Sequence, residues 1–449
     1  SPMAGPEGMN PMQQQMPQTA PPRPFTPVDS LYYLVTNTKQ PEFDYPEEDV
    51  KTPLPEGTVA DEDGIYGHYQ GTGGILLDSF LKRLAFAIRF TDVNLLLSGY
   101  ITPESRLMMY RAVRERAEMA APFLTYDADA YPVIADGKIY WMIDGYATSL
   151  FYPYSSVYSR LFNYIRNSVK VVSSAHEGEL NYYVIDKEDP VTKVWSRIYP
   201  SLFKPYEQMP EGLKSHIRYP RGLFQAQASM YRLYHMTSPS QFYSKEDAWE
   251  FPQQQYGDTW TVMEPHYLIM KLPGRPKAEF MLLMPFTPAS KENMIGWMAA
   301  HCDWPEYGNV TVFKFPKSKN TYGPRQVENR IQQNTDIAQA FTLWKNQNTK
   351  VIRGDLQVIP IDKSVLYVEP VYIVAAEQGL PELKRIIVAY GDEGENIAMA
   401  PTLADALRQI FGAGKKPERV APSAATGATE TAAVSDRKST RLNSSHRIR

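Results

Sequence analysis

The fold class is predicted most sharply by one stretch of the sequence, Tyr131-Pro132-Val133-Ile134-Ala135-Asp136-Gly137-Lys138-Ile139-Tyr140-Trp141-Met142-Ile143. Two runs rich in β-branched and aromatic residues flank Asp136-Gly137, a dipeptide that favours the two-residue type I′ turn. Such a turn joins neighbouring antiparallel strands, because its twist matches theirs. We therefore predict a β-hairpin with strands at residues 131–135 and 138–143.

Alternation of apolar and polar residues predicts further strands outside this hairpin. A second hairpin pairs residues 266–272 with 279–285 around Pro273-Gly274-Arg275-Pro276. Additional strands are predicted at residues 309–315, 350–361, 365–374 and 383–390. The strand pairs cluster between separate helices instead of alternating with them one by one, which favours mainly antiparallel sheets.

Two helices are predicted in the first third of the chain. Residues 77–90 form an amphipathic helix whose apolar face carries Leu77, Phe80, Leu81, Leu84 and Ile88. A second helix is expected to begin with Thr102 as N-cap and Pro103 in the first turn, and to end at Pro122. Its predicted buried stripe contains Leu107, Tyr110, Val113, Ala117 and Ala120.

Two more helices are predicted near the end of the chain. A long one follows Gly323-Pro324 and turns inward Val327, Ile331, Ala338, Phe341 and Trp344. The last runs from the N-cap Thr402, with Asp405 near its third position, to Gly412. The predicted fold class is therefore α+β, with mixed, mainly antiparallel sheets and several amphipathic helices. Because one core rarely grows past about 250–300 residues, we expect two lobes, with a boundary near residues 235–260.

The two ends differ from the middle in composition. Residues 1–28 are rich in Met, Pro and Gln and are interpreted as a low-complexity linker, and residues 413–435 as a flexible linker. Residues 436–449 open with DRKSTRLNSSH, which resembles the translation of a sequencing-library adapter, so we interpret them as an artefact. They carry five Lys or Arg and one Asp, so without them the formal charge falls from −3 to −7. The remaining domain, residues 29–412, is acidic.

Composition excludes several classes of function. The acidic balance argues against a nucleic-acid partner, which selects a basic face. A single cysteine, Cys302, excludes an internal disulfide framework and a multi-cysteine zinc site. No apolar run approaches the ~20 residues that span a bilayer; the best runs, 278–286 and 365–376, are interrupted by Glu279 and Glu369.

Acidic residues provide the candidate site. Asp127, Asp129 and Asp144 lie around the first hairpin, and alternating acids in one loop are a ligand pattern that calcium uses. The EF-hand loop and its terminal Glu are absent, and Asp is also a common turn residue. We therefore hypothesise a structural corner shared by the three carboxylates and Tyr126. Either an arginine (Arg106 or Arg114) or, as the sharper version, calcium neutralises this corner; no other cofactor is predicted.

Other motifs favour structure over chemistry. Gly71-Thr72-Gly73-Gly74 offers backbone amides to an anion, but it lacks the dinucleotide and P-loop patterns and is interpreted as a structural turn. His301 and Cys302 are adjacent, so their side chains do not face each other, and an inert buried thiol is favoured. Clustered tyrosines such as Tyr152, Tyr154 and Tyr158 fit either a carbohydrate or peptide groove or ordinary core and rim packing, and packing is favoured.

Residues 30–412 resemble one family along their whole length. The segments that carry the resemblance are Val35-Thr36-Asn37-Thr38-Lys39-Gln40-Pro41-Glu42-Phe43-Asp44-Tyr45-Pro46, Ala121-Pro122-Phe123-Leu124-Thr125-Tyr126-Asp127, residues 136–146, Tyr152-Pro153-Tyr154-Ser155, residues 224–249 and residues 353–370. They are similar to the extracytoplasmic part of uncharacterised protein family 0182, large multi-pass bacterial cell-membrane proteins. The chain departs from the family near residues 173–179, where an aspartate-containing turn is expected.

The resemblance implies a location more than an activity. It implies several transmembrane helices that precede this fragment, with the present segment on the extracytoplasmic side of the cell membrane. It brings no catalytic residue or cofactor, so we favour a non-enzymatic domain for envelope binding or assembly. Its implied partners are its own N-terminal transmembrane helices, other envelope proteins or cell-wall glycans. The alternative is an envelope hydrolase that uses the carboxylates near Asp127, Asp129 and Asp144 in a cleft.

Overall fold

The computed structural model describes residues 33–36, 59–61, 64–66, 69–272, 275–316, 318–345, 349–361, 364–375, 379–391, 393–394 and 396–412. The chain divides into two compact units between His216 and Ile217. The interval 235–260, where the sequence places a lobe boundary, lies within the second unit. The predicted linkers at residues 1–28 and 413–435 and the stretch 436–449 lie outside the described residues.

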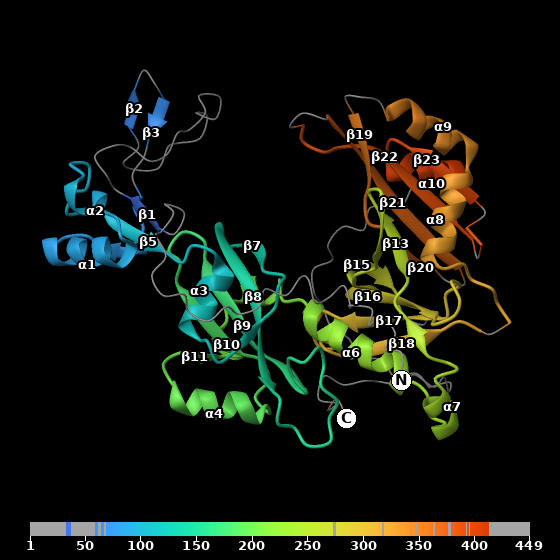
Figure 1. Ribbon diagram of the computed structural model, residues 1–449, viewed down its shortest axis with the longest axis horizontal. Helices are drawn as coiled ribbons and strands as arrows, with labels where there is room; N and C mark the ends of the chain where they lie inside the picture. The colour runs from blue at the N-terminus through green and yellow to red at the C-terminus, as the bar shows by residue number, and fades with distance from the viewer. Residues whose placement is uncertain are drawn as a thin grey trace, which may run out of the picture. The chain divides into compact units, whose positions relative to one another are not determined.

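The first unit begins with a small sheet in the order β1-β5-β4 and two helices (Figure 1). Its elements are β1 (Tyr33–Thr36), β4 (Ile75–Leu76), α1 (Phe80–Phe90), α2 (Asn94–Leu97) and β5 (Arg106–Met109). β2 (Val59–Asp61) and β3 (Gly64–Tyr66) form a separate two-stranded sheet. The small core of this part contains Leu77, Ala87, Phe90, Leu95 and Leu107.

The larger sheet of the first unit has the order β11-β10-β9-β8-β6, with β7 also paired to β8. Its strands are β6 (Thr125–Tyr126), β7 (Tyr131–Ala135), β8 (Lys138–Ser149), β9 (Tyr164–Ser174), β10 (Leu180–Val184) and β11 (Phe203–Pro205). All pairs are antiparallel except β10 with β11. Asp136 and Gly137 both have positive φ, 52° and 73°, which confirms the predicted type I′ hairpin.

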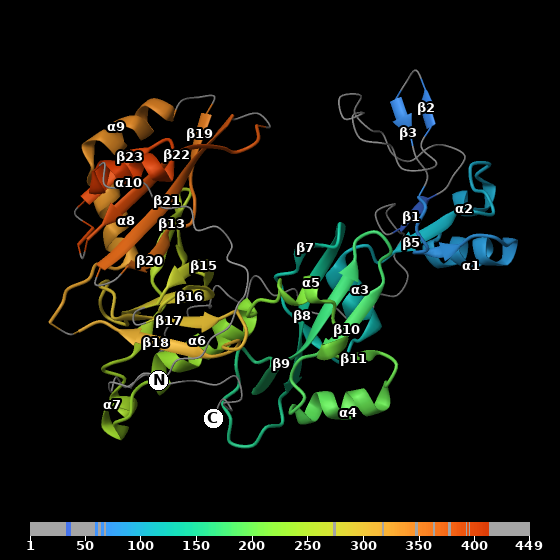
Figure 2. The ribbon, with the colours of Figure 1, turned by 180° about the vertical axis from the view of Figure 1, so that it is seen from behind.

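Helices pack around this sheet, and one of them, α4, connects two of its strands. They are α3 (Val113–Ala120), α4 (Pro190–Ile198), the short 3-10 helix η3 (Tyr206–Gln208) and α5 (Glu211–Lys214). Ala117 of α3 packs on Ile143, Val169, Val171 and Tyr182, which share one face of the sheet. α4 lies beside β11 in both views (Figures 1 and 2).

The predicted helix from Thr102 is wrong over its first half. Thr102 and Ser105 instead close a turn, in which the Ser105 amide donates to the Thr102 carbonyl at 3.1 Å. Leu107 is fully buried as predicted, but in β5, which pairs with both β1 and β4. Tyr110 has φ +51°, which ends the strand and separates it from α3. Long-range strand pairing overrides the local helical pattern here.

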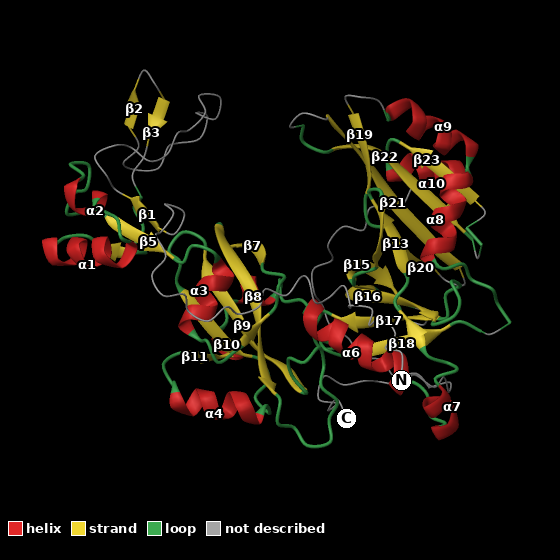
Figure 3. Cartoon of the chain, in the orientation of Figure 1, coloured by secondary structure: helices red, strands yellow, loops and turns green. Residues whose placement is uncertain are grey.

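The second unit contains two larger sheets and a β13–β14 ribbon (Figure 3). One sheet has the order β12-β16-β17-β18 with β15 on β16, and the other has the order β19-β21-β22-β23 with β20 on β21. The strands are β12 (Trp249–Glu250), β13 (Gln253–Tyr256), β14 (Thr259–Val262), β15 (His266–Lys271), β16 (Ala278–Pro288), β17 (Gly296–His301), β18 (Val310–Lys314), β19 (Thr349–Arg353), β20 (Gln357–Ile361), β21 (Ser364–Ala375), β22 (Glu382–Tyr390) and β23 (Asn396–Ala400). These bounds confirm the predicted strand regions, except that residues 350–361 are divided between β19 and β20.

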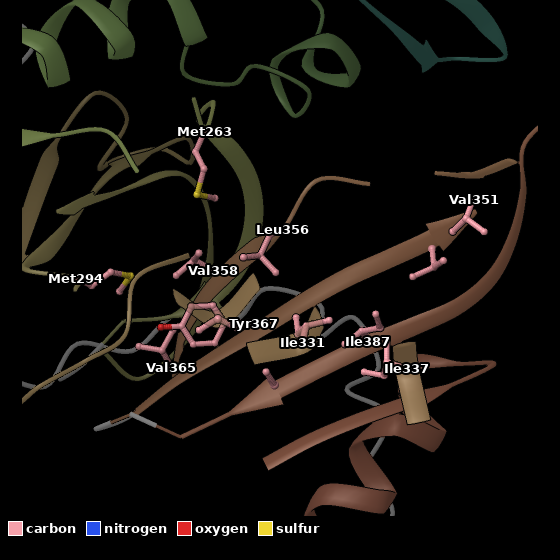
Figure 4. Close-up of a cluster of buried hydrophobic side chains, with 13 residues drawn as sticks. Met263, Met294, Ile331, Ile337, Val351, Leu356, Val358, Val365, Tyr367 and Ile387 are labelled. Carbon is pink, nitrogen blue, oxygen red and sulfur yellow. The ribbon is translucent and has the colours of Figure 1, made fainter. Parts of the chain in front are cut away.

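Helices pack on both faces of the β19–β23 sheet. The helices of the second unit are α6 (Arg221–Tyr234), α7 (Pro239–Ser244), α8 (Pro324–Gln333), α9 (Thr335–Trp344) and α10 (Leu403–Phe411). Val365 and Tyr367 of β21 pack with Ile331 of α8 (Figure 4), and the alternate residue Leu366 packs in the cluster that contains Ala406 of α10. Three layers result, because successive strand residues point to opposite faces.

Two predicted elements of this unit are each divided in two. The long helix after Gly323-Pro324 breaks at Asn334, whose side chain accepts from the amides of Asp336 and Ile337 and so caps α9. The predicted strand 350–361 bends at Gly354, whose amide donates to the Pro370 carbonyl at 2.8 Å. The final helix is confirmed, with the Thr402 side chain accepting from the Asp405 amide.

The observed architecture is α+β, as predicted. Its longest helix among the described residues is α6, with 14 residues. None of the helices in the described ranges is long and apolar enough to cross a bilayer.

Candidate functional site

The pairing of β6 with β8 brings two of the predicted acids together. Tyr126 lies opposite Gly145, and the Asp127 amide donates to the Asp144 carbonyl at 2.9 Å. Both side chains are buried, Asp127 at 4% and Asp144 at 2% exposure. Asp129 is half-buried, and its amide donates to Asp127 Oδ1 at 2.8 Å. The β6–β8 pairing therefore brings Asp127 and Asp144 into one buried corner, where Asp127 forms an Asx turn with the Asp129 amide.

Lys170 is the cation that pairs with Asp144 in this corner. It lies directly opposite Asp144 in the β8–β9 register, is 1% exposed, and its ammonium contacts Asp144 Oδ1. Arg106 instead donates to the Thr72 and Gly73 carbonyls, and Arg114 to Glu118 at 2.8 Å. The predicted neutralisation by Arg106 or Arg114 is therefore wrong, because the nearest cation comes from the neighbouring strand.

Two tyrosines complete the surroundings in different ways. The Tyr146 hydroxyl donates to Asp127 Oδ2. The Tyr126 hydroxyl lies 2.9 Å from the Ala117 carbonyl and 3.0 Å from the Ala121 carbonyl, so it binds the end of α3. Burial raises the pKa of Tyr126 far above its usual range. Tyr126 therefore does not join the carboxylates, contrary to the hypothesis.

The chemistry open to this corner is limited by its contacts. A hydrolytic acid–base pair must reach a substrate proton directly or through one water. Asp127 and Asp144 are buried and already accept hydrogen bonds from Tyr146 and Lys170. Across the residues that the structure describes, no three His, Cys, Asp or Glu side chains are grouped in a way that holds a metal ion.

The glycine loop binds an anion that belongs to the chain itself. Glu177 Oε2, from the turn between β9 and β10, accepts from the Thr72 amide at 2.6 Å, the Thr72 hydroxyl at 2.9 Å and the Gly73 amide at 3.0 Å. A Cβ on Gly73 would lie 2.3 Å from the Glu177 carbonyl oxygen, so this approach requires glycine. Burial alone raises the pKa of Glu177, but hydrogen bonds from Thr72 and His176 lower it to about 2. This geometry agrees with a structural turn.

The remaining candidates from the sequence are Cys302, His301 and the clustered tyrosines, and most of them make structural contacts. Cys302 is buried, and its Sγ accepts from the Tyr219 amide at 3.4 Å, while the His301 Nδ1 lies 2.7 Å from Glu279 Oε2. Tyr152 stacks on Tyr164 with ring centroids 5.6 Å apart. Tyr154, in contrast, is fully exposed. The clustered tyrosines are thus divided between packing and surface.

Helix α1 exposes the apolar face that its sequence pattern would bury. Phe80, Leu81 and Ile88 are 68%, 75% and 65% exposed and lie on one side of the helix, because residues seven or eight apart are two turns apart. We call these three residues the α1 surface. Ala87, two turns after Phe80, and Phe90 form the adjoining side of the helix and are buried in the small core of this part of the unit.

Polar and apolar neighbours extend this surface. Lys82 and Arg89, seven residues apart, lie along one edge of it, where Lys82 pairs with Asp78 at 2.7 Å and Arg89 donates to the Tyr110 hydroxyl at 2.7 Å. In the adjoining α2 segment, Val93 and Leu97 are 60% and 77% exposed. The α1 surface is thus an exposed apolar stripe with Lys82 and Arg89 along one edge.

Comparisons with known proteins show which family the chain belongs to. The model of the Uncharacterised protein family (UPF0182) matches residues 8–344, well over half of the sequence. The chain belongs to the UPF0182 family. It is 47% identical over 387 residues to a UPF0182 protein of Methanospirillum hungatei, covering 85% of this chain and 41% of that protein. No solved structure matches it.

UPF0182 proteins of other organisms are similar to this chain over a similar share of its length. Identity is 47% over 384 residues to that of Desulforamulus reducens, covering 85% of this chain and 40% of the relative. It is 44% over 412 residues to that of Bradyrhizobium diazoefficiens, covering 91% of this chain and 42% of the relative. The chain therefore spans about two-fifths of the length of the curated relatives it matches.

The second unit of this UPF0182 chain holds a buried charge cluster that no motif predicted. Arg353 of β19 binds Glu369 of β21 through two nitrogens, one of them at 2.6 Å from Oε2, and contacts Glu328 of α8. A third contact joins Arg353 Nη1 to Gln255 Oε1 at 2.7 Å. The signal in the sequence was Glu369, an acid inside an apolar strand, which requires a partner.

One guanidinium faces two carboxylates in this cluster. All three side chains are buried. Burial raises the pKa of Glu328 to about 8, the charge of Glu369 adds to this rise, and Arg353 opposes it. Burial also raises the pKa of Glu369, against the hydrogen bonds and charge of Arg353. Because Glu369 receives the two-pronged contact, we assign the shared proton to Glu328.

Proposed function

We propose that this chain is the extracytoplasmic binding and assembly domain of a multi-pass cell-membrane protein. The observation that carries the proposal is the α1 surface, an amphipathic helix whose apolar stripe faces outward. Phe80, Leu81 and Ile88 each keep at least 65% of their surface exposed. Covering side chains of this size contributes about 1–2 kcal/mol each at such exposures, which favours a covered over an exposed α1 surface.

The distribution of apolar and basic residues on α1 suits a partner that is apolar and borders a polar region. Helices that lie at a membrane interface combine an apolar face with Lys and Arg at its border. Here Arg89, and Lys82 in its pair with Asp78, lie along one edge of the α1 surface. We propose the protein's own N-terminal transmembrane helices as the partner, because the relatives are more than twice as long as the matched segment. Another envelope protein or a cell-wall glycan is the alternative occupant.

The alternative of an envelope hydrolase draws less support from the geometry. Asp144 is paired with Lys170, and Asp127 accepts from Tyr146 and from the Asp129 amide. A catalytic carboxylate with a raised pKa and access to a cleft is what that function requires. We therefore propose no catalytic role for Asp127, Asp129 or Asp144.

Topology provides the test. The full-length protein, expressed in its host, should fractionate with membranes, and protease added to intact cells should cleave within residues 29–412. A cytoplasmic domain expressed in the same cells is the control for intactness. Recovery in the soluble fraction, or protection of residues 29–412 while a known surface protein is digested, would contradict the proposal.

A further inference from the structure

A cleft lies between α4 and the β10–β11 edge of the first unit. Its volume is about 340 Å³, within the range of small-molecule sites. Asp189 fixes the start of α4 by accepting from the amides of Val191 and Thr192, and the parallel β10–β11 pair forms the facing wall. The cleft is therefore built from regular elements instead of a loose loop.

The wall of the cleft is apolar. Val184 lies opposite Pro205 in the β10–β11 register, and Phe203 lies on the same strand face as Pro205. All three residues line the cleft. Thr192 and Ser196, one helical turn apart on α4, face them. An apolar group fits this wall better than a fully hydrated ion does.

Positive charge dominates the lining. Lys187, Lys193, Arg197 and Lys204 line the cleft against a single acid, Asp186. The charge of Asp186 is already neutralised by Arg166, at 2.5 Å. This excess is local, because the chain as a whole has a formal charge of −3.

The cations remain available to a ligand. Lys187 pairs with Glu207 and Lys193 with Glu188, but both acids are largely exposed, at 62% and 82%, and such pairs are weak. Lys204 donates to the neutral Asn181 side chain. Arg197 makes no hydrogen bond or ion pair with any residue in the described part of the chain. Its planar guanidinium is suited to two-pronged binding of phosphate or carboxylate.

We propose that this cleft binds a small amphiphilic anion, a phosphate monoester or carboxylate attached to an apolar group. Arg197, with Lys193 and Lys187, binds the anionic head, and Val184, Phe203 and Pro205 contact the apolar group. The proposal depends on the cleft alone and is independent of where the full-length protein is located.

Calorimetric titration of the intact chain tests this proposal. n-Octyl phosphate, below its micelle concentration, should bind saturably with one site, and more tightly than inorganic phosphate. n-Octyltrimethylammonium, with the same tail and a positive head, should not bind. Arg197→Ala should weaken octyl phosphate binding at least about tenfold, because a charge-assisted contact is lost. Arg197→Lys should lie between the two.

Controls separate this site from general charge effects. Arg111→Ala removes another exposed arginine of the first unit and should leave binding unchanged. An unchanged circular dichroism melt would show that Arg197→Ala is folded. Absence of saturable binding, equal affinity for inorganic and octyl phosphate, or equal weakening by Arg111→Ala and Arg197→Ala would overturn the proposal.

Discussion

The Glu328–Arg353–Glu369 cluster allows a quantitative prediction about protonation. With both acids ionised, the buried cluster carries a net negative charge; with one proton it is neutral. The pKa of Glu328 rises from 4.5 to about 8 in the folded protein. A group with a raised folded pKa contributes stability that is present below its unfolded pKa and is lost as the pH rises through its folded pKa. Wild-type stability should therefore fall between pH 5 and 8.

The size of the effect follows from the same shift. Linkage gives a loss of about 3 kcal/mol between pH 5 and 8, an upper value because the acids titrate together. Glu328→Gln retains the shape of the protonated acid and has no proton to lose. This variant should match or exceed wild-type stability at pH 7, and its stability should vary less with pH.

A double-mutant cycle isolates the charge balance. Glu369→Gln leaves Glu328 free to ionise against Arg353, so it too keeps a neutral cluster and should cost about 1–3 kcal/mol in lost hydrogen bonds. Glu328→Gln combined with Glu369→Gln leaves the buried guanidinium without a carboxylate and should cost about 3–5 kcal/mol. Glu382→Gln, at an exposed strand position, is the matched control.

Urea unfolding at pH 5, 6, 7 and 8 measures these differences. The reasoning is refuted if Glu328→Gln loses more than about 3 kcal/mol at pH 7 and its pH dependence remains that of the wild type. That result would mean that Glu328 is ionised in the folded state.

Three further predictions concern the first unit. Lys170→Met should destabilise the protein by about 3–5 kcal/mol because Asp144 remains buried without its cation, and Lys170→Met with Asp144→Asn should recover part of that loss in urea unfolding. Glu177→Gln should lower the melting temperature at pH 7; since the pKa of Glu177 is lowered to about 2, its contribution is present above pH 4.5 and should vanish as the pH falls through 2, so that wild type and variant melt alike there. Millimolar calcium should leave the melting temperature unchanged, as should a chelator; a rise with calcium that Asp127→Asn abolishes would restore the metal version of the acidic corner.

Features determined by neighbouring residues were predictable from the sequence. The Asp136-Gly137 turn and the cap of the last helix by Thr402 depend on local backbone preferences, and both are confirmed. The segment 106–109 was mistaken for helix because its pairing partners, β1 and β4, are far away in the sequence. Local propensity carries no information about such partners.

The candidate site was predictable only in part, for the same reason. The acids Asp127 and Asp144 were found from their places around the first hairpin, but Lys170 enters through the β8–β9 register, which a sequence pattern does not determine. Amphipathicity predicted helix α1 without indicating what its apolar face contacts. The structure buries Ala87 and Phe90 instead and leaves Leu81 outside. An apolar helical stripe shows that a partner surface is needed, and not which one.

The solvent environment at Leu81 tests the proposed docking of the α1 surface most directly. Leu81→Cys in a Cys302→Ser background carries one polarity-sensitive fluorophore, and Lys138→Cys, at the exposed hairpin, is the matched control. In the isolated chain both labels should report water. In the full-length membrane protein the emission at position 81 should shift to the blue and resist aqueous quenchers, while that at position 138 should stay unchanged. Equal, water-like emission at both positions in the full-length protein would contradict the assignment of the α1 surface as a contact site.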